Sequence, residues 1–295
     1  MQIGLVLPHT GSSATPSFVR DFAQTAEAAG IDGLWAVDHL VLPHHAESLY
    51  VLGRKPGPVR DGSLSETLSP NYEMITTLAW IAAHTNTIGL GTSVAVLPIR
   101  NAVANARQLA TLDLLCGGRL TYGIGIGWLR EEAEAMGMPW DQRAQRSEEH
   151  IALMRTLWCA PGPLVEFRGR YHDLPPMDPQ PQPVQRPIPI LIGGHSDAAL
   201  KRAARIGDGW IAAPMSPERL AERRRLLYAY AEDRGRSTDD LRIVASVRPQ
   251  PGSSLADLMD TYRQAGVDHL QVLLPTTDPT QALTDIGRVA EARDG

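Results

Sequence analysis

Cysteine is scarce in this sequence, which excludes two classes of site. The chain has 295 residues and 2 cysteines, Cys116 and Cys159. A single pair at this separation matches neither the ligand spacing of a zinc site nor a redox motif. Both cysteines lie in apolar stretches with helical periodicity, so we expect two buried, reduced thiols.

An excess of basic charge is also missing. The 28 lysines and arginines are outnumbered by 33 aspartates and glutamates, giving a net charge of −5 and a pI of about 6.0. Proteins that bind the phosphate backbone of nucleic acids usually carry a basic excess or stripe. We therefore expect no nucleic-acid partner, and we interpret the run Arg223-Arg224-Arg225 as the solvated face of a helix.

Long apolar runs are missing as well. No stretch approaches the ~20 apolar residues that a membrane-spanning helix needs. The segment Met1–Pro8 leads into a strand pattern and has neither the basic region nor the cleavage site of a signal peptide. The sequence therefore predicts a soluble, cytoplasmic protein with no membrane partner.

Glycine and proline, by contrast, are abundant. The chain holds 26 glycines and 23 prolines, and 43% of its residues are hydrophobic, close to the usual share for a packed globular protein. A chain of this length can bury a core without disulfides or metals. Of the 23 prolines, 12 lie in the two segments 39–70 and 161–187, which we expect to be excursions from the regular fold, the second of them irregular.

Apolar runs typical of buried strands alternate with helical periodicity along the chain. The predicted strands are 2–8, 33–37, 87–96, 119–127, 188–192, 209–213, 241–247 and 269–274. The predicted helices are 16–29, 71–84, 101–116, 130–136, 141–159, 196–206, 217–234, 254–265 and 279–292. Eight such βα units predict an α/β fold, a (β/α)8 TIM barrel formed by residues 1–295 as a single domain.

A two-domain, doubly wound dinucleotide fold is the alternative. Its fingerprint is G-x-G-x-x-G after the first strand. The glycine-rich stretch Gly123–Gly127 has G-x-G-x-G spacing instead and follows the fourth strand, and the sequence has no P-loop. The barrel is therefore favoured, and we look for functional residues at the C-terminal ends of its strands.

Asp38 and His39 close the second predicted strand. A histidine at this place can donate a hydrogen bond to a ring carbonyl or act as a proton donor. The alternative is a structural histidine supported by Asp38. The strand-end position favours function, so both are candidate catalytic residues.

Glycines mark the ends of three further strands. The stretch Gly91–Val94 indicates a close backbone approach or a simple bulge, and Gly125–Trp128 fits backbone lying against a flat ring or tight barrel packing. Gly193–Ser196 precedes a helix, where free N–H groups and the helix dipole favour a phosphate, although Ser196 could be an ordinary N-cap. We interpret Gly207–Trp210 as packing.

Together and in this order, the motifs resemble the bacterial luciferase-like flavin and deazaflavin oxidoreductases, and within them the enzymes that use coenzyme F420. The resemblance runs from Ile3 to about Trp210 and is looser beyond. Its carriers are Ala28–Trp35 with Asp38-His39, Leu90–Val94, Ala110–Asp113 with Gly117–Leu120, Gly123–Trp128, Ile192–Gly194 and Gly207–Trp210.

The resemblance implies a deazaflavin ring across the barrel mouth and a homodimer. It also implies a non-proline cis peptide bond between Ser93 and Val94 that props one face of the ring. Asp38 and His39 would meet the ring edge, and the glycines after strand five would hold the phosphate. The implied cofactor-binding residues are Asp38, His39, Ser93, Val94, Gly125, Gly127, Gly193, Gly194, His195 and Ser196.

One position departs from the family pattern. The sugar-phosphate dehydrogenases of the family carry a glutamate directly after the Gly-x-Gly of strand four, where this chain has Trp128. Glu131 and Glu132 follow, but on the next predicted helix. This chain therefore has no carboxylate at the position where those enzymes carry their acid–base residue. We therefore expect a substrate less polar than a sugar phosphate.

These inferences predict an F420-dependent oxidoreductase that transfers a hydride between the deazaflavin and a small organic metabolite. We expect it to reduce a C=C or C=N bond, with His39 as general acid. Trp128, His44 and His45, with Trp35 nearby in sequence, are expected to shape the substrate pocket.

The sequence also allows three alternatives. An FMN-dependent luciferase-like monooxygenase would use the same pocket. A TIM-barrel metal hydrolase would use strand-end histidines, for which His9, His39, His44 and His45 are the candidates, but their positions do not favour it and we predict no metal site. A non-catalytic flavin-binding protein is the third.

Overall fold

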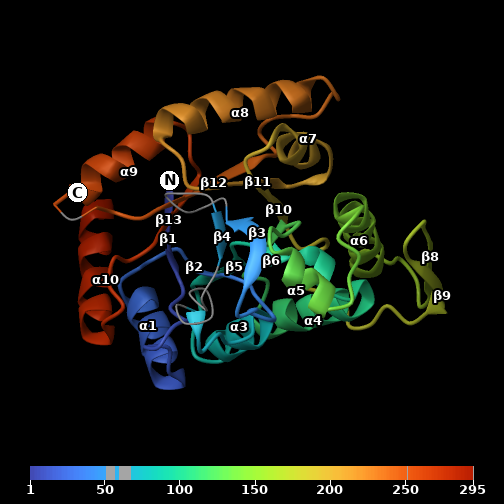
Figure 1. The fold of residues 1–295 in the computed structure, drawn as a ribbon, viewed down its shortest axis with the longest axis horizontal. Helices are drawn as coiled ribbons and strands as arrows, with labels where there is room; N and C mark the ends of the chain where they lie inside the picture. Colours follow the sequence, from blue (N-terminus) through green and yellow to red (C-terminus); the bar gives the residue numbers. More distant parts are fainter. Residues whose placement is uncertain (51–56, 60–67, 251, 295) are drawn as a thin grey trace.

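Eight parallel strands close into a barrel in the computed structural model (Figure 1), which describes residues 1–50, 57–59, 68–250 and 252–294. Each strand pairs with the next, and the last pairs with the first. This confirms the predicted TIM barrel. In order, the strands are β1 (Gln2–Val6), β2 (Gly33–Ala36), β5 (Gly89–Thr92), β7 (Leu120–Gly125), β10 (Ile190–Gly193), β11 (Gly209–Ala212), β12 (Arg242–Val247) and β13 (His269–Val272).

Short polar side chains fix the starts of several helices. Thr15, Ser196, Ser216 and Ser254 each accept a hydrogen bond from the backbone N–H three residues further on, which satisfies a donor that the first turn leaves unpaired. The helices are α1 (Pro16–Ala28), α3 (Met74–Ala82), α4 (Ala102–Leu115), α5 (Arg130–Ala135), α6 (Arg143–Trp158), α7 (Asp197–Ile206), α8 (Pro217–Glu232), α9 (Leu255–Gln264) and α10 (Pro279–Asp294).

The third predicted strand is divided. It is regular as β5 up to Thr92 and resumes as the two-residue strand β6 (Ala95–Val96), which pairs with β7. Between the two lies a cis peptide bond joining Ser93 to Val94. The bond that the resemblance implied is therefore present at the expected place.

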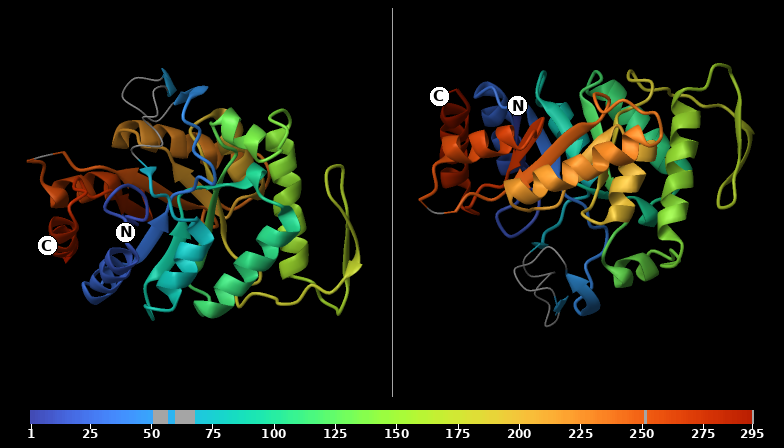
Figure 2. Two further views of the ribbon diagram at one scale, coloured as in Figure 1. Left: turned by 60° about the horizontal axis from the view of Figure 1, so that its bottom comes forward. Right: turned by 90° about the horizontal axis from the view of Figure 1, so that it is seen from above.

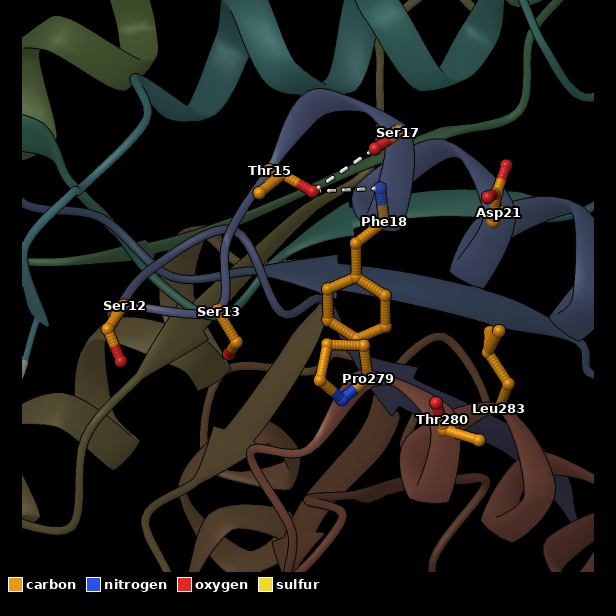
Figure 3. Close-up of a pocket in the computed structure, with 9 residues that line it drawn as sticks. All are labelled: Ser12, Ser13, Thr15, Ser17, Phe18, Asp21, Pro279, Thr280 and Leu283. Atoms are coloured by element: carbon orange, nitrogen blue, oxygen red, sulfur yellow. Dashed lines mark hydrogen bonds between the residues drawn. The ribbon is translucent and has the colours of Figure 1, made fainter.

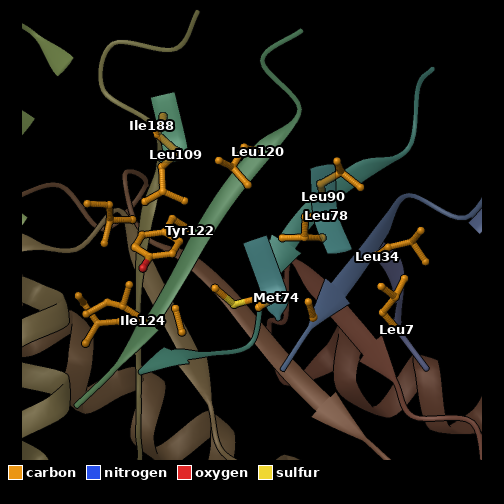
Figure 4. Close-up of a cluster of buried hydrophobic side chains, with 14 of the residues drawn as sticks. Leu7, Leu34, Met74, Leu78, Leu90, Leu109, Leu120, Tyr122, Ile124 and Ile188 are labelled. Carbon is orange, nitrogen blue, oxygen red and sulfur yellow. The ribbon is translucent and has the colours of Figure 1, made fainter. Parts of the chain in front are cut away.

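The main hydrophobic core lies between the barrel wall and the surrounding helices. Outward-facing strand residues such as Leu34, Leu90 and Leu120 pack in one cluster with Leu78 of α3 and Leu109 of α4 (Figure 4). All five are at most 2% exposed. Apolar residues in the strands thus face helices, as a parallel barrel requires.

A second, smaller cluster fills the barrel interior. Trp35 packs there with Leu191, Ile211 and Val244, and its indole N–H donates to Nε2 of His269 at 3.0 Å. Trp35 therefore lies inside the barrel, and the expectation that it shapes the substrate pocket is wrong. Its ring is large for a barrel interior and is accommodated by glycines on neighbouring strands.

Three aspartates tie the N-terminal ends of neighbouring strands together. Each stands immediately before a strand, and its carboxylate accepts a hydrogen bond from the first or second backbone N–H of an adjacent strand. The pairs are Asp32 with Ile3 at 2.7 Å, Asp208 with Ile190 at 2.8 Å and Asp268 with Ile243 at 2.7 Å. The repeated contact fixes the strand register at the end of the barrel away from the predicted site.

Both proline-rich excursions leave the barrel and contain hairpins (Figure 2). In segment 39–70, β3 (Ala46–Tyr50) pairs with β4 (Gly57–Val59), and part of that segment lies outside the described residues. In segment 161–187, β8 (Val165–Arg168) pairs with β9 (Asp173–Met177). The prediction that this second excursion is irregular is therefore wrong.

The second hairpin is held by a carboxylate of α6. Glu149 accepts hydrogen bonds from the backbone N–H groups of Arg170, Tyr171 and His172, at 2.7–2.8 Å. Burial alone would raise the pKa of Glu149, but these N–H donors outweigh it and lower the pKa. The proline content of the segment could not predict this contact, because Glu149 lies about twenty residues before the hairpin in the sequence.

Two surface expectations need correction. Cys116 is buried as predicted, and burial raises its pKa, but Cys159 is exposed because it ends α6. Arg223 is not part of a solvated face, since its side chain is only 17% exposed and pairs with Asp197 at 2.7 Å. Within the described ranges, every helix is too short or too polar to cross a bilayer.

Candidate functional site

His39 follows β2 at the C-terminal end of the barrel, as predicted, and its side chain is 14% exposed. Its Nδ1 lies 2.9 Å from Oε2 of Glu132, whose side chain is only 1% exposed. An ionised carboxylate can only accept, so Nδ1 carries the proton in this contact. The ring is thereby oriented by a buried carboxylate.

Two adjacent glutamates in the first turn of α5 hold the segment that follows His39. Oε1 of Glu132 accepts from the backbone N–H groups of Leu40 at 2.6 Å and Val41 at 3.2 Å. Glu131 accepts from the N–H groups of Glu47 and Ser48 and from the Ser48 hydroxyl, at 2.6–3.1 Å. Sequence reasoning missed these contacts, because it placed both glutamates on the next helix and assigned them no partner.

Asp38 is engaged in a buried ion pair. Its carboxylate accepts from the backbone N–H of Val96 at 2.8 Å and from Nη2 of Arg100 at 2.7 Å, and Arg100 also lies 3.3 Å from Glu73. Burial is the largest influence on Asp38 and raises its pKa, although Arg100 opposes that shift. Both carboxylate oxygens are occupied by the protein, which suits a positioning residue rather than a group that meets the ring edge.

The three residues predicted to shape the substrate pocket lie in two different places. Trp128 lies beside His39, with ring centroids 6.1 Å apart and the rings edge to face. His44 and His45 are exposed and pack against each other at 4.7 Å. Trp128 thus joins the His39 site directly, while the two histidines belong to the approach to the first hairpin.

The cis peptide carries Val94 into a cradle made by two glycines. A Cβ at Gly125 would lie 2.8 Å from Val94 Cγ2, and one at Gly193 would lie 2.7 Å from Val94 Cγ1. These glycines therefore make room for the valine side chain, which stands partly exposed between β7 and β10. Gly127 has a positive φ of 76°, which favours glycine there.

A polar network lies beside this bulge. The amide of Gln271 on β13 bridges the hydroxyls of Ser93 and Ser246, which donate to Oε1 at 2.8 and 2.6 Å. Gln271 is fully buried, and its Nε2 has no hydrogen-bond partner among the described residues. A buried amide with one unpaired group is uncommon and marks a place where a further polar group fits.

The predicted phosphate loop is well anchored. Gly194 has φ of +125°, its carbonyl accepts from the Trp210 indole at 2.6 Å, and Ser196 caps α7. Arg223 of α8 donates to the carbonyl of His195 at 2.9 Å. The arginine, which also pairs with Asp197 at the start of α7, holds this loop from a helix that follows β11, so no local sequence signal could reveal it.

The remaining histidine candidate and the hollows lie elsewhere. His9 is buried with its ring nitrogens 3.0 Å from the carbonyls of Leu7 and Val37, and the described part of the chain contains no group of three potential metal ligands. A hollow of about 560 Å³ lies between the first turns of α1 and α10 (Figure 3). The described residues that line it include none of the predicted site residues.

Comparison with known sequences identifies relatives over most of the chain. A family model for luciferase-like monooxygenases matches residues 1–293. An uncharacterised protein of Mycobacterium tuberculosis is 35% identical over 206 residues, 69% of this chain and 68% of that protein. An F420-dependent glucose-6-phosphate dehydrogenase of Kineococcus radiotolerans is 32% identical over 199 residues, 66% of this chain and 52% of that enzyme.

Solved structures with the same fold cover nearly the whole chain. An F420-dependent secondary alcohol dehydrogenase superposes with a TM-score of 0.78 at 16% identity, covering 99% of this chain and 98% of that one. A monooxygenase of Streptomyces bottropensis also gives 0.78, at 21% identity and the same coverage. At these identities the likeness is one of fold.

Proposed function

Because the chain belongs to the luciferase-like monooxygenase family, we propose that it is an F420-dependent oxidoreductase acting on a small organic metabolite. The observation that carries the proposal is the His39–Glu132 pair at the barrel mouth, at the same end of the barrel as the Ser93–Val94 cis peptide. The F420 dependence of the Kineococcus radiotolerans relative supports the choice of cofactor.

The residues present suit this cofactor. Val94, fixed between Gly125 and Gly193, offers an apolar surface to one face of a flat ring. The backbone N–H groups of Ser196 and of the first residues of α7 are offered to a phosphate, with Arg223 close behind the loop. When bound, F420 supplies or accepts a hydride at the substrate carbon.

His39 would supply the proton that completes a reduction of a C=C or C=N bond. In that reduction, Nε2 of the His39 imidazolium would give its proton to the atom of the double bond that does not receive the hydride. The imidazole becomes neutral and is reprotonated from solvent, so charge and atoms balance. Asp38, held by Arg100 and Val96, keeps the end of β2 in place for this transfer.

Trp128 argues for a substrate with an apolar surface. It stands where sugar-phosphate dehydrogenases of the family carry a glutamate, and its ring packs edge to face on His39. An indole there supplies contact area and no acid–base group. We therefore propose a metabolite less polar than a sugar phosphate, and a homodimeric enzyme, as the resemblance implies.

Titration of the apo-protein with F420 and with FMN tests the cofactor. Quenching of cofactor fluorescence should saturate with F420 and not with FMN at the same concentrations. Tight FMN binding with oxygen uptake would replace the proposal by a flavin monooxygenase.

Replacement of His39 tests the proton donor. The substitution His39→Ala should lower turnover by about 10²–10⁴-fold and leave F420 binding within a few-fold, because general acid catalysis contributes on that order. Turnover close to that of the unmodified enzyme would remove His39 from the chemistry.

A further inference from the structure

We infer that Glu132 is the positioning residue that sets the protonation of His39, fixing a proton on Nδ1 so that Nε2 is the nitrogen that exchanges protons with the substrate. The inference rests on the proposed role of His39. It uses the 2.9 Å contact between Nδ1 and Oε2 of Glu132, and the burial of that carboxylate at 1% exposure. Buried ion-pair geometry of this kind holds a ring in one tautomer and orientation.

The two oxygens of Glu132 have separate tasks. Oε1 receives the backbone N–H groups of Leu40 and Val41, and Oε2 faces His39. The backbone donors point at Oε1 from the segment directly after His39, so the carboxylate is tied both to the imidazole and to the chain that follows it. Glu132 occupies Nδ1 of His39, so Nε2 is the ring nitrogen that would face the substrate.

This arrangement makes a sharp prediction for the isosteric amide. In Glu132→Gln, the position of Oε1 must hold the amide oxygen, because two backbone N–H donors converge on it. The amide NH₂ then faces Nδ1 of His39. Two donors cannot face each other, so Nδ1 must give up its proton and accept, and the proton of the neutral ring moves to Nε2.

Reversal of the tautomer removes the acid form. The imidazolium needs protons on both nitrogens, and in Glu132→Gln the proton on Nδ1 would meet an N–H donor instead of a carboxylate. A neutral ring that gave up its Nε2 proton would have to become an anion. We expect turnover to fall by about 10²–10⁴-fold, the range that general acid catalysis contributes.

Glu131 provides the matched control. It is the neighbouring residue in the same first turn of α5, and it holds the same excursion through Glu47 and Ser48 without touching His39. If Glu132 acted only by fastening the segment after β2, Glu131→Gln and Glu132→Gln would have similar effects. If it sets the His39 proton, only Glu132→Gln changes the ring.

The readout is ¹⁵N NMR of the full-length apo-protein labelled at histidine, near pH 8. The signals of His39 are identified by their absence in His39→Ala. We expect the unmodified protein and Glu131→Gln to show Nδ1 in the protonated, pyrrole-like range and Nε2 in the unprotonated, pyridine-like range. Glu132→Gln should show the two ranges exchanged, and Glu132→Asp should be assayed for partial recovery of turnover.

Each outcome decides one of two questions. Unchanged His39 signals in Glu132→Gln, or the same change in Glu131→Gln, overturn the positioning role of Glu132 whatever the activity. Exchanged signals in Glu132→Gln alone support it. Full turnover in His39→Ala overturns the proposed proton donor and leaves the tautomer result standing by itself.

Discussion

At the scale of single residues, several strand glycines are explained by one side chain on a neighbouring strand. A Cβ at Gly91 would lie 2.4 Å from the ring of Trp35, and one at Gly4 would lie 2.3 Å from His269. The bulky pair inside the barrel is possible only because its neighbours have no side chains. Space, rather than backbone freedom, is the reason for glycine at these positions.

The substitution Gly91→Ala should therefore destabilise the protein by about 1–3 kcal/mol, as overpacking of a filled interior does. Gly287 in α10 is the control, since nothing lies within 4 Å of its absent Cβ. Gly287→Ala should stabilise by roughly 0.5–1 kcal/mol, the helix preference of alanine over glycine. Urea unfolding measures both, and equal effects of the two substitutions would contradict this account.

Two buried histidines should make stability depend on pH. Burial lowers the pKa of His269 to about 3, and burial also lowers that of His150 to about 3, helped by the charges of His172 and Arg100. Between these values and the ordinary pKa of 6.5, the unfolded chain binds more protons than the folded one. Stability therefore falls as the pH drops through that window.

Each histidine should contribute a slope of about 1.4 kcal/mol per pH unit between pH 6.5 and 5. Urea unfolding at pH 7, 6 and 5 measures the slope in the unmodified protein and in His269→Gln. The glutamine can accept the Trp35 hydrogen bond and does not titrate, so the slope should fall by about one histidine's share. An unchanged slope would show that His269 is not buried in its neutral form.

At the scale of elements, carboxylates that accept backbone N–H groups join pieces that are distant in sequence. Asp32, Asp208 and Asp268 do this between strands, Glu149 for the β8–β9 hairpin, and Glu131 with Glu132 for the segment after β2. In each case a carboxylate satisfies donors that a strand end or a turn leaves unpaired. The barrel ends and both excursions are fixed by the same chemistry.

Removal of one such carboxylate should cost stability. The backbone N–H of Ile3 donates to Asp32 at 2.7 Å and loses this acceptor in Asp32→Ala. The free energy of unfolding should therefore fall by about 1–3 kcal/mol. Asp21→Ala is the control, because Asp21 forms an exposed ion pair with its neighbour Arg20, and its effect should stay within about 0.5 kcal/mol. Thermal unfolding compares them, and similar losses would argue against the strand-end role.

At the scale of the whole molecule, the two ends of the barrel have different tasks. The N-terminal strand ends carry the aspartate contacts, while the C-terminal ends carry His39, the cis peptide and the α7 loop. This division of stability from function is general for such barrels. A cofactor bound at the second end should stabilise the entire chain.

F420 at about 100 times its Kd should therefore stabilise the folded protein by roughly 2.7 kcal/mol, a rise in Tm of roughly 4 °C for a chain of this size. Arg223→Ala should reduce the rise, because Arg223 holds the loop at His195. Arg225→Ala, which alters an exposed residue of the same run, should not. Equal losses in the two variants, or an equal rise with FMN, would contradict the assignment of the cofactor loop.

Much of the fold and part of the site followed from local patterns. Every predicted barrel strand is present, since apolar runs and their spacing from helices depend on neighbours in sequence. His39 and Trp128 were found because strand ends are visible in those patterns, and the structure brings them together. Local patterns did not predict the roles of four other residues, because each contacts a partner that lies 28 to 178 residues away in the sequence. These residues are Glu132, Arg100, Gln271 and Arg223.

The sequence by itself determined the barrel, the place of the strand ends and the family resemblance, because periodicity and motif order are local properties of the chain. Only the tertiary structure decided which side chains meet at those ends. In the folded chain Asp38 pairs with Arg100, and His39 contacts Glu132, a residue 93 positions away. A hydrogen bond depends on distance in space, and barrel closure brings together groups that no local pattern connects.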